Sequence, residues 1–301
     1  MKVVITGATG AIGVALINKL IQEGNEVLVI TRKESKRNVN IPKNENVNIV
    51  FSALNELAGL EINGGYDVFY HLAWDGTVGA DRNNAKKQCD NVRYTIDAVR
   101  LAHRLGCQTF IGVGSQAEYG RVCEPLNSKT ATFPENGYGM AKLCAGQLSS
   151  LEAKSLGLRH IWVRVLSVYG PYDGMQSVVM STINKVRNGE PIECTKGEQI
   201  WDFLYSEDAA NALHLLGKSN LDKKIYVLGS GEGKPLSSYI EEICNMLNAK
   251  SKPVFGAIPY SPNQVMFLQA DIRELQVDVG WKPTTSFKEG VLKTARYLST
   301  Q

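Results

Sequence analysis

The stretch Thr-Gly-Ala-Thr-Gly-Ala-Ile-Gly at residues 6–13 constrains the fold of this 301-residue chain more than any other. It joins an apolar run, residues 3–5, to a helical pattern of apolar residues that continues to Ile21, so it is predicted to be a turn between a strand and a helix. Such a turn directs free backbone N–H groups at one point, and the glycines remove side chains that would block an approaching pyrophosphate. The alternative is a tight turn in which the glycines serve only packing.

A second predicted strand, residues 26–31, follows this helix and favours the nucleotide site over the packing alternative. The residues at its end bear on the choice of cofactor. An acidic side chain here would bind the ribose hydroxyl of NAD, whereas Arg32 and Lys33 are cationic and suit the additional phosphate of NADP. We therefore expect NADP, with NAD as the alternative. The same cations would also fit an ordinary solvated loop.

Composition and charge exclude several classes of protein. The net charge of +3 comes from interspersed Lys and Glu, without the basic block that nucleic-acid binding favours. The first strand begins at residue 2 and no apolar run is long enough to span a bilayer, so we expect a cytoplasmic protein without membrane contact. The six cysteines and four histidines are scattered, which predicts reduced thiols and no metal site.

Strands and helices alternate over about the first 170 residues, which predicts an α/β fold with a Rossmann-type, doubly wound parallel sheet. Residues 1–170 are predicted to form this dinucleotide-binding domain. Residues 171–301 are predicted to form mainly a smaller substrate-binding α/β region, with some segments returning to the first domain. Further strands are expected at residues 47–51, 66–73, 109–114 and 160–166, the first two of them buried, and long helices at 83–105 and 138–155.

The predicted fourth strand ends in His71-Leu72-Ala73 and is followed by Trp74 and Asp75. His71 is expected to be a packed histidine rather than a catalyst, because so apolar a strand is normally part of the core. Trp74 and Asp75 lie beyond the carboxyl end of the strand, where open α/β sheets bind their ligands. We expect them to contact substrate, or only to shape the loop.

Tyr138 and Lys142 are the candidate chemical groups, because a spacing of four places both on one face of a helix. A nearby lysine cation favours phenolate and lowers the pKa of a tyrosine, which would make Tyr138 a general acid or base. The pair alone is as consistent with a solvated helix surface. Ser115, at the end of the predicted fifth strand, adds a hydroxyl that could act at the same place.

The glycine pattern with Ser115, Tyr138 and Lys142 resembles the short-chain dehydrogenase/reductase superfamily, and is most similar to its extended branch, the NAD(P)-dependent epimerase/dehydratase family. The resemblance covers essentially the whole chain. It implies that Ser115 holds the substrate oxygen, Tyr138 transfers a proton, and Lys142 lowers the pKa of Tyr138 and binds the nicotinamide ribose. It also implies a homodimer formed by the two long helices and a supporting role for Asn91. The cofactor contacts that we expect are Gly7, Thr9, Gly10, Ala11, Ile12, Gly13, Arg32, Lys33, Leu72, Ala73, Tyr138 and Lys142.

Three departures from the family pattern bear on the reaction. Members that dehydrate sugar nucleotides have an Asp-Glu pair where this chain has Gln116 and Ala117, so the resemblance implies an epimerase or reductase instead. Ser167 replaces an asparagine, and Trp201 replaces the arginine that grips the substrate diphosphate.

The region around Trp201 is similar to reductases of 4-keto-6-deoxy sugar nucleotides, which implies a nucleotide-sugar substrate. The expected substrate contacts are Trp74, Asp75, Ser115, Gln116, Ser167 and Trp201. The alternatives are an NAD-dependent 4-epimerase and a non-catalytic dinucleotide sensor.

Overall fold

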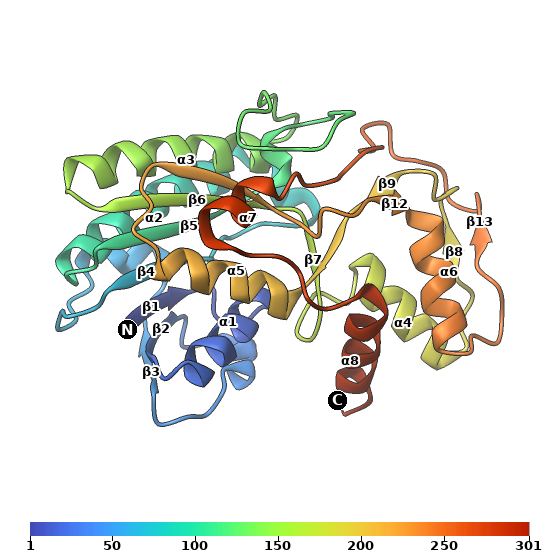
Figure 1. Cartoon of the computed structure of the whole chain (residues 1–301), viewed down its shortest axis with the longest axis horizontal. Coiled ribbons are helices and arrows are strands. Elements are labelled where there is room, and N and C mark those ends of the chain that lie inside the picture. The colour runs from blue at the N-terminus through green and yellow to red at the C-terminus, as the bar shows by residue number, and fades with distance from the viewer. Residues whose placement is uncertain (301) are drawn as a thin grey trace.

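The computed structural model describes residues 1–300, and its centre is one sheet of seven parallel strands (Figure 1). The strand order is β11-β6-β5-β4-β1-β2-β3, which confirms the Rossmann-type doubly wound sheet. The strands are β1 (Lys2–Thr6), β2 (Glu26–Thr31), β3 (Val47–Phe51), β4 (Val68–His71), β5 (Thr109–Ser115), β6 (Arg159–Val165) and β11 (Lys224–Leu228). The order reverses between β1 and β4, and open sheets of this kind bind ligands outside the carboxyl ends of the strands at that point.

Helices cover both faces of the sheet, with α2 and α3 on one side and α1 and α5 on the other (Figure 1). Apolar side chains of the strands, such as Ile5 and Val29, pack with α1 and α5, while their neighbours, such as Val4 and Leu28, pack with α2 and α3. This alternation follows from the pleat of a strand, which directs successive side chains to opposite faces. The helices are α1 (Ala11–Gln22), α2 (Ala85–Arg104), α3 (Gly137–Ser155) and α5 (Ser206–Lys218).

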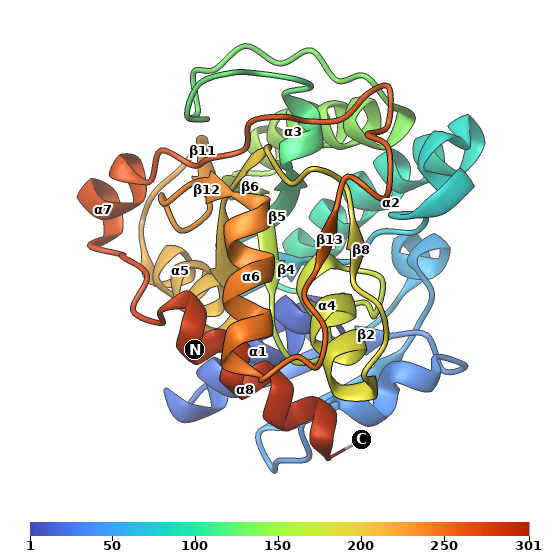
Figure 2. The ribbon, with the colours of Figure 1, turned by 90° about the vertical axis from the view of Figure 1, so that its right-hand side faces the viewer.

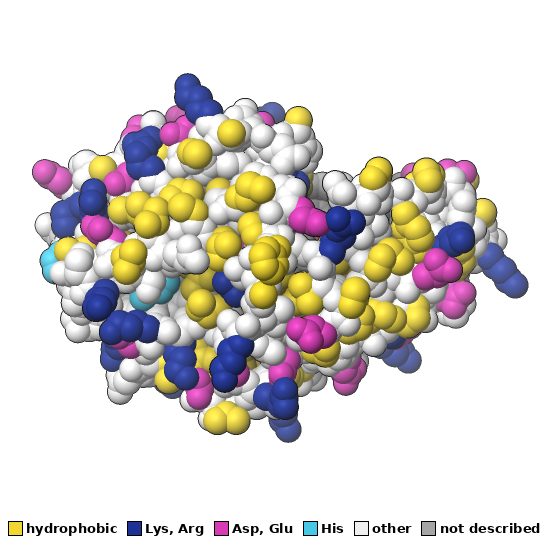
Figure 3. All heavy atoms as spheres, turned by 90° about the horizontal axis from the view of Figure 1, so that it is seen from above, with side chains coloured by type: hydrophobic (Ala, Val, Ile, Leu, Met, Phe, Trp, Pro, Cys, Tyr) yellow, Lys and Arg dark blue, Asp and Glu magenta, His cyan; other side chains and the backbone are white. Residues whose placement is uncertain are grey.

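A smaller lobe lies beside the sheet and has its own core (Figure 2). Three helices pack on one another there, and an aromatic cluster that includes Tyr169, Phe203, Tyr239 and Phe287 fills the space beneath them. Seen from above, a notch separates this lobe from the larger body (Figure 3). The elements of the region are β7 (Ser167–Tyr169), α4 (Val178–Asn188), β8 (Glu193–Cys194), β9 (Ile200–Trp201), β10 (Phe203–Tyr205), β12 (Lys234–Pro235), α6 (Leu236–Met246), β13 (Val254–Phe255) and α8 (Phe287–Ser299).

Several segments late in the chain lie against the first lobe. Strand β11 adds to the edge of the main sheet beside β6, and α5 packs against α1. The short helix α7 (Arg273–Val279) packs against α5. The part of the chain that the structure describes also contains four 3₁₀ turns: η1 (Lys36–Asn40), η2 (Leu54–Gly59), η3 (Gly79–Asn83) and η4 (Gln116–Glu118).

Two expectations about the strands were wrong. Strand β3 is not buried: it lies at the edge of the sheet, and Ile49 and Phe51 are exposed. An apolar run does not show whether a strand will have neighbouring strands on both sides or only on one, and for this reason the sequence did not predict that β3 is an edge strand. Strand β4 is shorter than predicted, because residues 66–67 precede it and residues 72–73 already belong to the loop that follows.

Helix α3 leaves three large apolar side chains, Met140, Leu148 and Leu151, exposed on the surface. They lie on a helix that packs beside α2, and hydrophobic side chains gather on the upper face of the larger lobe (Figure 3). The homodimer through these two helices stays a prediction.

Candidate active site

The glycine-rich turn has the shape that the sequence predicts. Gly7 has a φ of 76°, and a Cβ there would lie 2.5 Å from the backbone nitrogen of Ala73, so the turn packs directly against the end of β4. Gly10 is the N-cap of α1, where no side chain caps the helix. The first N–H groups of α1 are therefore available to an anion, and the open space above Gly10 suits the close approach of a pyrophosphate. These residues fit a dinucleotide.

Besides Arg32 and Lys33, a further cation, Arg37, lies close to the glycine-rich turn, which the sequence did not indicate. Its Nη2 is the nearest atom to a Cβ built on Gly10, at 3.9 Å, and donates to the carbonyl oxygen of Tyr172 at 2.6 Å. Asn38 orders the preceding loop by donating to the carbonyl oxygens of Arg32 and Lys33, whose side chains are exposed at the end of β2. Sequence reasoning missed Arg37 because nothing in the spacing shows that η1 folds back over the turn.

His71 is a packed histidine, as expected. Its ring nitrogens lie 2.8 Å from Thr6 Oγ1 and 3.4 Å from Thr95 Oγ1. Burial lowers the pKa of His71 to about 3, so the ring is neutral at physiological pH.

The loop after β4 is held in place by α2. Trp74 Nε1 donates to Gln88 Oε1 at 2.9 Å, which fixes the indole over the site. Asn91 Oδ1 accepts from the Asp75 backbone N–H, and Asn91 Nδ2 donates to the Asp75 carbonyl oxygen, both at 2.9 Å. Asn91 therefore supports the loop rather than the reacting groups, and Trp74 is the residue of this loop that faces the candidate catalytic groups.

The structure brings Ser115, Tyr138 and Lys142 together at the carboxyl end of β5. Tyr138 stands in the first turn of α3, and hydrogen bonding from the Ser115 side chain lowers the pKa of its phenol. One turn later, the buried Lys142 donates from Nζ to the carbonyl oxygen of Val113 at 2.6 Å, and the same nitrogen lies 3.9 Å from the Trp74 ring centroid. Trp74 meets the Tyr138 ring edge-on, with 6.0 Å between centroids. The indole thus covers both helix residues.

The pKa values of these groups differ from the sequence expectation. Burial raises the pKa of Tyr138, and the groups that oppose this are the Ser115 hydrogen bond and the positive charge of Arg82. Burial also lowers the pKa of Lys142 to about 7, against the attraction of Glu118, which favours the ammonium. At neutral pH the phenol of Tyr138 therefore carries its proton and can donate it.

Glu118 is a functional candidate that sequence reasoning missed. Its buried carboxylate accepts from the Ser115 N–H at 2.8 Å, from Trp162 Nε1 at 3.1 Å and from Arg164 Nε at 2.6 Å. The signal was present, because Ser115 and Glu118 have the Ser-x-x-Glu spacing of a capping box, which here closes η4. The Glu118–Arg164 pair thus fixes the backbone of the turn that presents Ser115.

Trp201 connects this edge of the sheet to the smaller lobe. Its Nε1 donates to Ser167 Oγ at 2.7 Å, and Ser167 lies just beyond Val165, the strand partner of Ser115. Two of the positions that depart from the family pattern, Ser167 and Trp201, are therefore hydrogen-bonded to each other.

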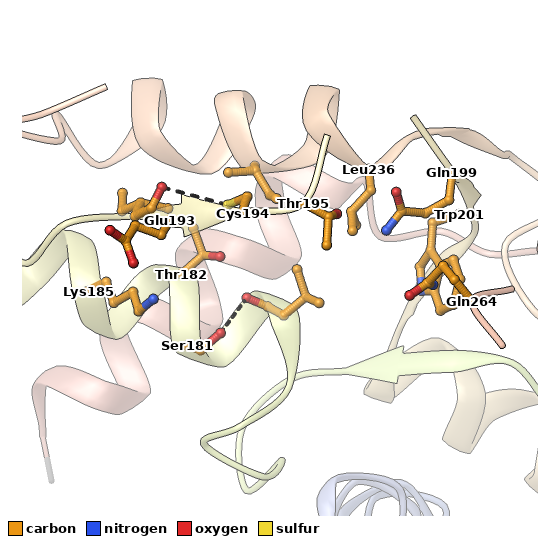
Figure 4. A pocket seen from close by; sticks show the side chains of 13 residues that line it. Ser181, Thr182, Lys185, Glu193, Cys194, Thr195, Gln199, Trp201, Leu236 and Gln264 are labelled. Carbon is orange, nitrogen blue, oxygen red and sulfur yellow. Dashed lines mark hydrogen bonds between the residues drawn. The ribbon is translucent and has the colours of Figure 1, made fainter. Parts of the chain in front are cut away.

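A cavity of about 290 Å³ opens beside Trp201 (Figure 4). Gln199, Trp201 and Gln264 lie together at one end, and Lys185 and Glu193 at the other. The predicted substrate contacts thus divide into two groups. Trp74 and Ser115 lie beside Tyr138 at the carboxyl end of β5, whereas Trp201, which is hydrogen-bonded to Ser167, lines the cavity.

Comparison with known proteins agrees with this geometry. Residues 3–229 match the model of the NAD dependent epimerase/dehydratase family. The chain belongs to this family. The family assignment confirms the resemblance drawn from the glycine turn and from Ser115, Tyr138 and Lys142.

Relatives in the family carry out several reactions. dTDP-4-dehydro-6-deoxyglucose reductase of Escherichia coli is 28% identical, over 98% of this chain and 97% of that protein. CDP-abequose synthase of Salmonella typhimurium is 25% identical over 98% of each. Among solved structures, the UDP-glucose 4-epimerase of Thermotoga maritima, with UDP-glucose, superposes with a TM-score of 0.89 over 100% of this chain and 99% of that one. It is 22% identical, so this likeness concerns the fold.

Within residues 1–300, no three His, Cys, Asp or Glu side chains are grouped so that they could hold a metal ion. None of the helices in this range is both long and apolar enough to cross a membrane.

Proposed function

We propose that this protein uses NADPH to reduce the 4-keto group of a nucleotide-activated 6-deoxyhexose. The turn that follows β5 carries the proposal. It presents Ser115 to a protonated Tyr138, and it has Gln116 and Ala117 where the dehydratases have their acids. A site of this composition can protonate a developing alkoxide but lacks the carboxyl groups that would remove water from a hexose. In the proposed reaction the substrate therefore arrives as a ketone that another enzyme has already formed.

The roles of the side chains follow from their positions. The Tyr138 phenol donates its proton to the C4 oxygen of the sugar as negative charge develops there, and the Ser115 hydroxyl donates a hydrogen bond to the same oxygen. When bound, the dinucleotide supplies the hydride that adds to C4. Lys142 lies one turn along the same helix and donates to the Val113 carbonyl oxygen, and Trp74 shields both Lys142 and Tyr138 from water.

The cavity beside Trp201 is where we place the nucleotide part of the substrate. The indole of Trp201 offers a flat surface on which an aromatic base can stack. Gln199 and Gln264 offer amide groups that can hydrogen-bond with the edge of that base. Lys185, which lines the opposite end of the cavity, adds a positive charge there. The names of two relatives, a dTDP-4-dehydro-6-deoxyglucose reductase and a CDP-abequose synthase, support a deoxysugar nucleotide as substrate.

The preference for NADPH rests on Arg32 and Lys33 at the end of β2. We expect Arg32→Asp to raise the KM for NADPH about 10- to 150-fold relative to the KM for NADH, which corresponds to about 1.5–3 kcal/mol for one charged hydrogen bond. Steady-state kinetics with both cofactors measures this. Lys43→Asp, which makes the same change of charge on the exposed loop before β3, serves as the control. Equal losses with NADPH and NADH in Arg32→Asp would contradict the assignment.

A screen of keto-sugar nucleotides tests the proposed function. Each of the dTDP, CDP, UDP and GDP derivatives of a 4-keto-6-deoxyhexose is added to the protein with NADPH or NADH, and cofactor oxidation is followed by absorbance. We expect oxidation of NADPH with at least one of them. Interconversion of two hexose nucleotides without cofactor oxidation would favour the 4-epimerase, and tight cofactor binding with no turnover of any sugar nucleotide would favour the sensor.

A further inference from the structure

Arg82 stands over the candidate proton donor, although no sequence pattern marked it. It lies in η3, and the carbon of its guanidinium is 4.5 Å from the centroid of the Tyr138 ring. Its Nη1 donates to the Thr77 carbonyl oxygen at 2.8 Å, which holds the side chain across the loop. The next residue, Asn83, accepts from the Gly137 N–H at 2.9 Å. The segment that carries Arg82 is therefore attached to the start of the helix that carries Tyr138.

Lys142 is farther from the phenol than Arg82 is. Its ammonium nitrogen lies 5.9 Å from the Tyr138 ring centroid and is directed to the Val113 carbonyl oxygen and the Trp74 ring. Burial lowers the pKa of Lys142 to about 7, so this lysine is only partly charged at neutral pH. The guanidinium of Arg82, by contrast, is a permanent cation, as in every arginine.

The elements packed around Tyr138 carry other charged side chains, whose effect on the phenol can be compared with that of Arg82. Glu118 of η4, paired with Arg164 of β6, opposes ionisation of the phenol. Beside Arg82, Lys87 pairs with Asp81 at 2.8 Å and lies 3.8 Å from Asp75, so one cation faces two carboxylates and this group adds no net positive charge near the phenol. Ser115 of β5 contributes a hydrogen bond rather than a charge. Arg82 is therefore the cation that most directly favours phenolate.

We propose that Arg82 is a positioning residue for proton transfer, which holds the Tyr138 ring in place and supplies the positive charge that stabilises its phenolate. A cation over an aromatic face attracts the neutral ring through its quadrupole, and attracts the ionised ring through its full negative charge. The second attraction is larger, so Arg82 assists the loss of the proton as well as the placement of the ring. The proposal rests on the proton-donor role of Tyr138 in the proposed function.

A titration of the phenol tests this without any substrate. Tyr138 is replaced by 3,5-difluorotyrosine, whose phenol ionises at lower pH than that of tyrosine, and its pKa is measured by fluorine NMR. Arg82→Met should raise this pKa by about one pH unit, because the opposite charge is lost. Arg82→Lys should keep most of the wild-type value, because it retains a cation. Arg93→Met removes a similar arginine, 4.8 Å from the Tyr94 ring on α2, and should leave the Tyr138 pKa unchanged.

The outcomes separate this inference from the proposed function. An equal rise of the pKa in the Met and Lys variants, or a rise in Arg82→Met no larger than in Arg93→Met, would overturn the role of Arg82. Should Arg82→Met fail to fold, Arg82→Gln removes the charge while keeping a donor for Thr77. If Arg82→Met shifts the phenol pKa but the wild-type protein reduces no keto sugar, the role of Arg82 is supported and the proposed reductase function is rejected.

Discussion

Tyr138→Phe should lower turnover about 10²- to 10⁴-fold, because it removes the proton donor while it keeps the aromatic ring between Trp74 and Arg82. The hydroxyl is the only group deleted, so cofactor affinity and thermal stability should stay close to those of the wild type. Single-turnover reduction of the keto sugar with NADPH measures the loss at the chemical step.

Tyr94→Phe is the matched control, because Tyr94 also has an arginine over its ring but lies on α2, outside the group around Ser115. It should retain wild-type turnover. A Tyr138→Phe variant with more than half of wild-type turnover would exclude Tyr138 as the proton donor.

Glu118→Gln should lower the free energy of unfolding by about 3–5 kcal/mol, the cost of leaving a buried charge without its partner. Arg164 lies 2.6 Å from Glu118, and both side chains are almost completely buried. Because the Glu118–Arg164 pair also fixes the turn that presents Ser115, displacement of this turn should lower turnover together with stability. Denaturant unfolding of the variant measures the first effect, and steady-state kinetics measures the second.

Two further variants identify the cause of this loss. Glu135→Gln breaks the exposed pair of Glu135 with Arg121 and should cost less than about 1 kcal/mol. Glu118→Gln combined with Arg164→Met removes both buried charges and should recover much of the stability, while the Ser115 turn still lacks its carboxylate. A double variant as unstable as Glu118→Gln alone would show that the uncompensated arginine is not the cause.

Short sequence patterns predicted those features of the candidate site that are formed by residues close together in the sequence. The strand, glycine turn and helix at residues 2–22 were confirmed, and Gly7 meets Ala73 because parallel strands end at one edge of the sheet. Tyr138 and Lys142 share a helix face for the same local reason. Periodicity alone could not show that β3 is an edge strand or that β11 joins the sheet next to β6, since both depend on neighbours distant in the sequence.

The residues that escaped prediction act across such distances. Arg82 reaches Tyr138 from a 3₁₀ turn 56 positions earlier, and Arg37 reaches Tyr172 across 135 positions. For Glu118, the sequence showed the local part only. The capping-box spacing with Ser115 was visible, but the buried partner of Glu118, Arg164, lies on β6 and could not be predicted. Local spacing in the sequence therefore predicts contacts within a turn, whereas contacts between charged side chains that are distant in the sequence depend on the fold.

The stereospecific fate of the cofactor hydrogen is the most direct test of the central claim, net reduction of a 4-keto sugar nucleotide. The protein is supplied with NADPH deuterated at the transferred position and with the 4-keto-6-deoxyhexose nucleotide that the screen selects. We predict one deuterium at C4 of the product for each NADPH consumed, and no product with Tyr138→Phe on the same timescale. The account is contradicted if the protein instead retains NAD through purification and interconverts two hexose nucleotides with no deuterium gained and no NADPH consumed.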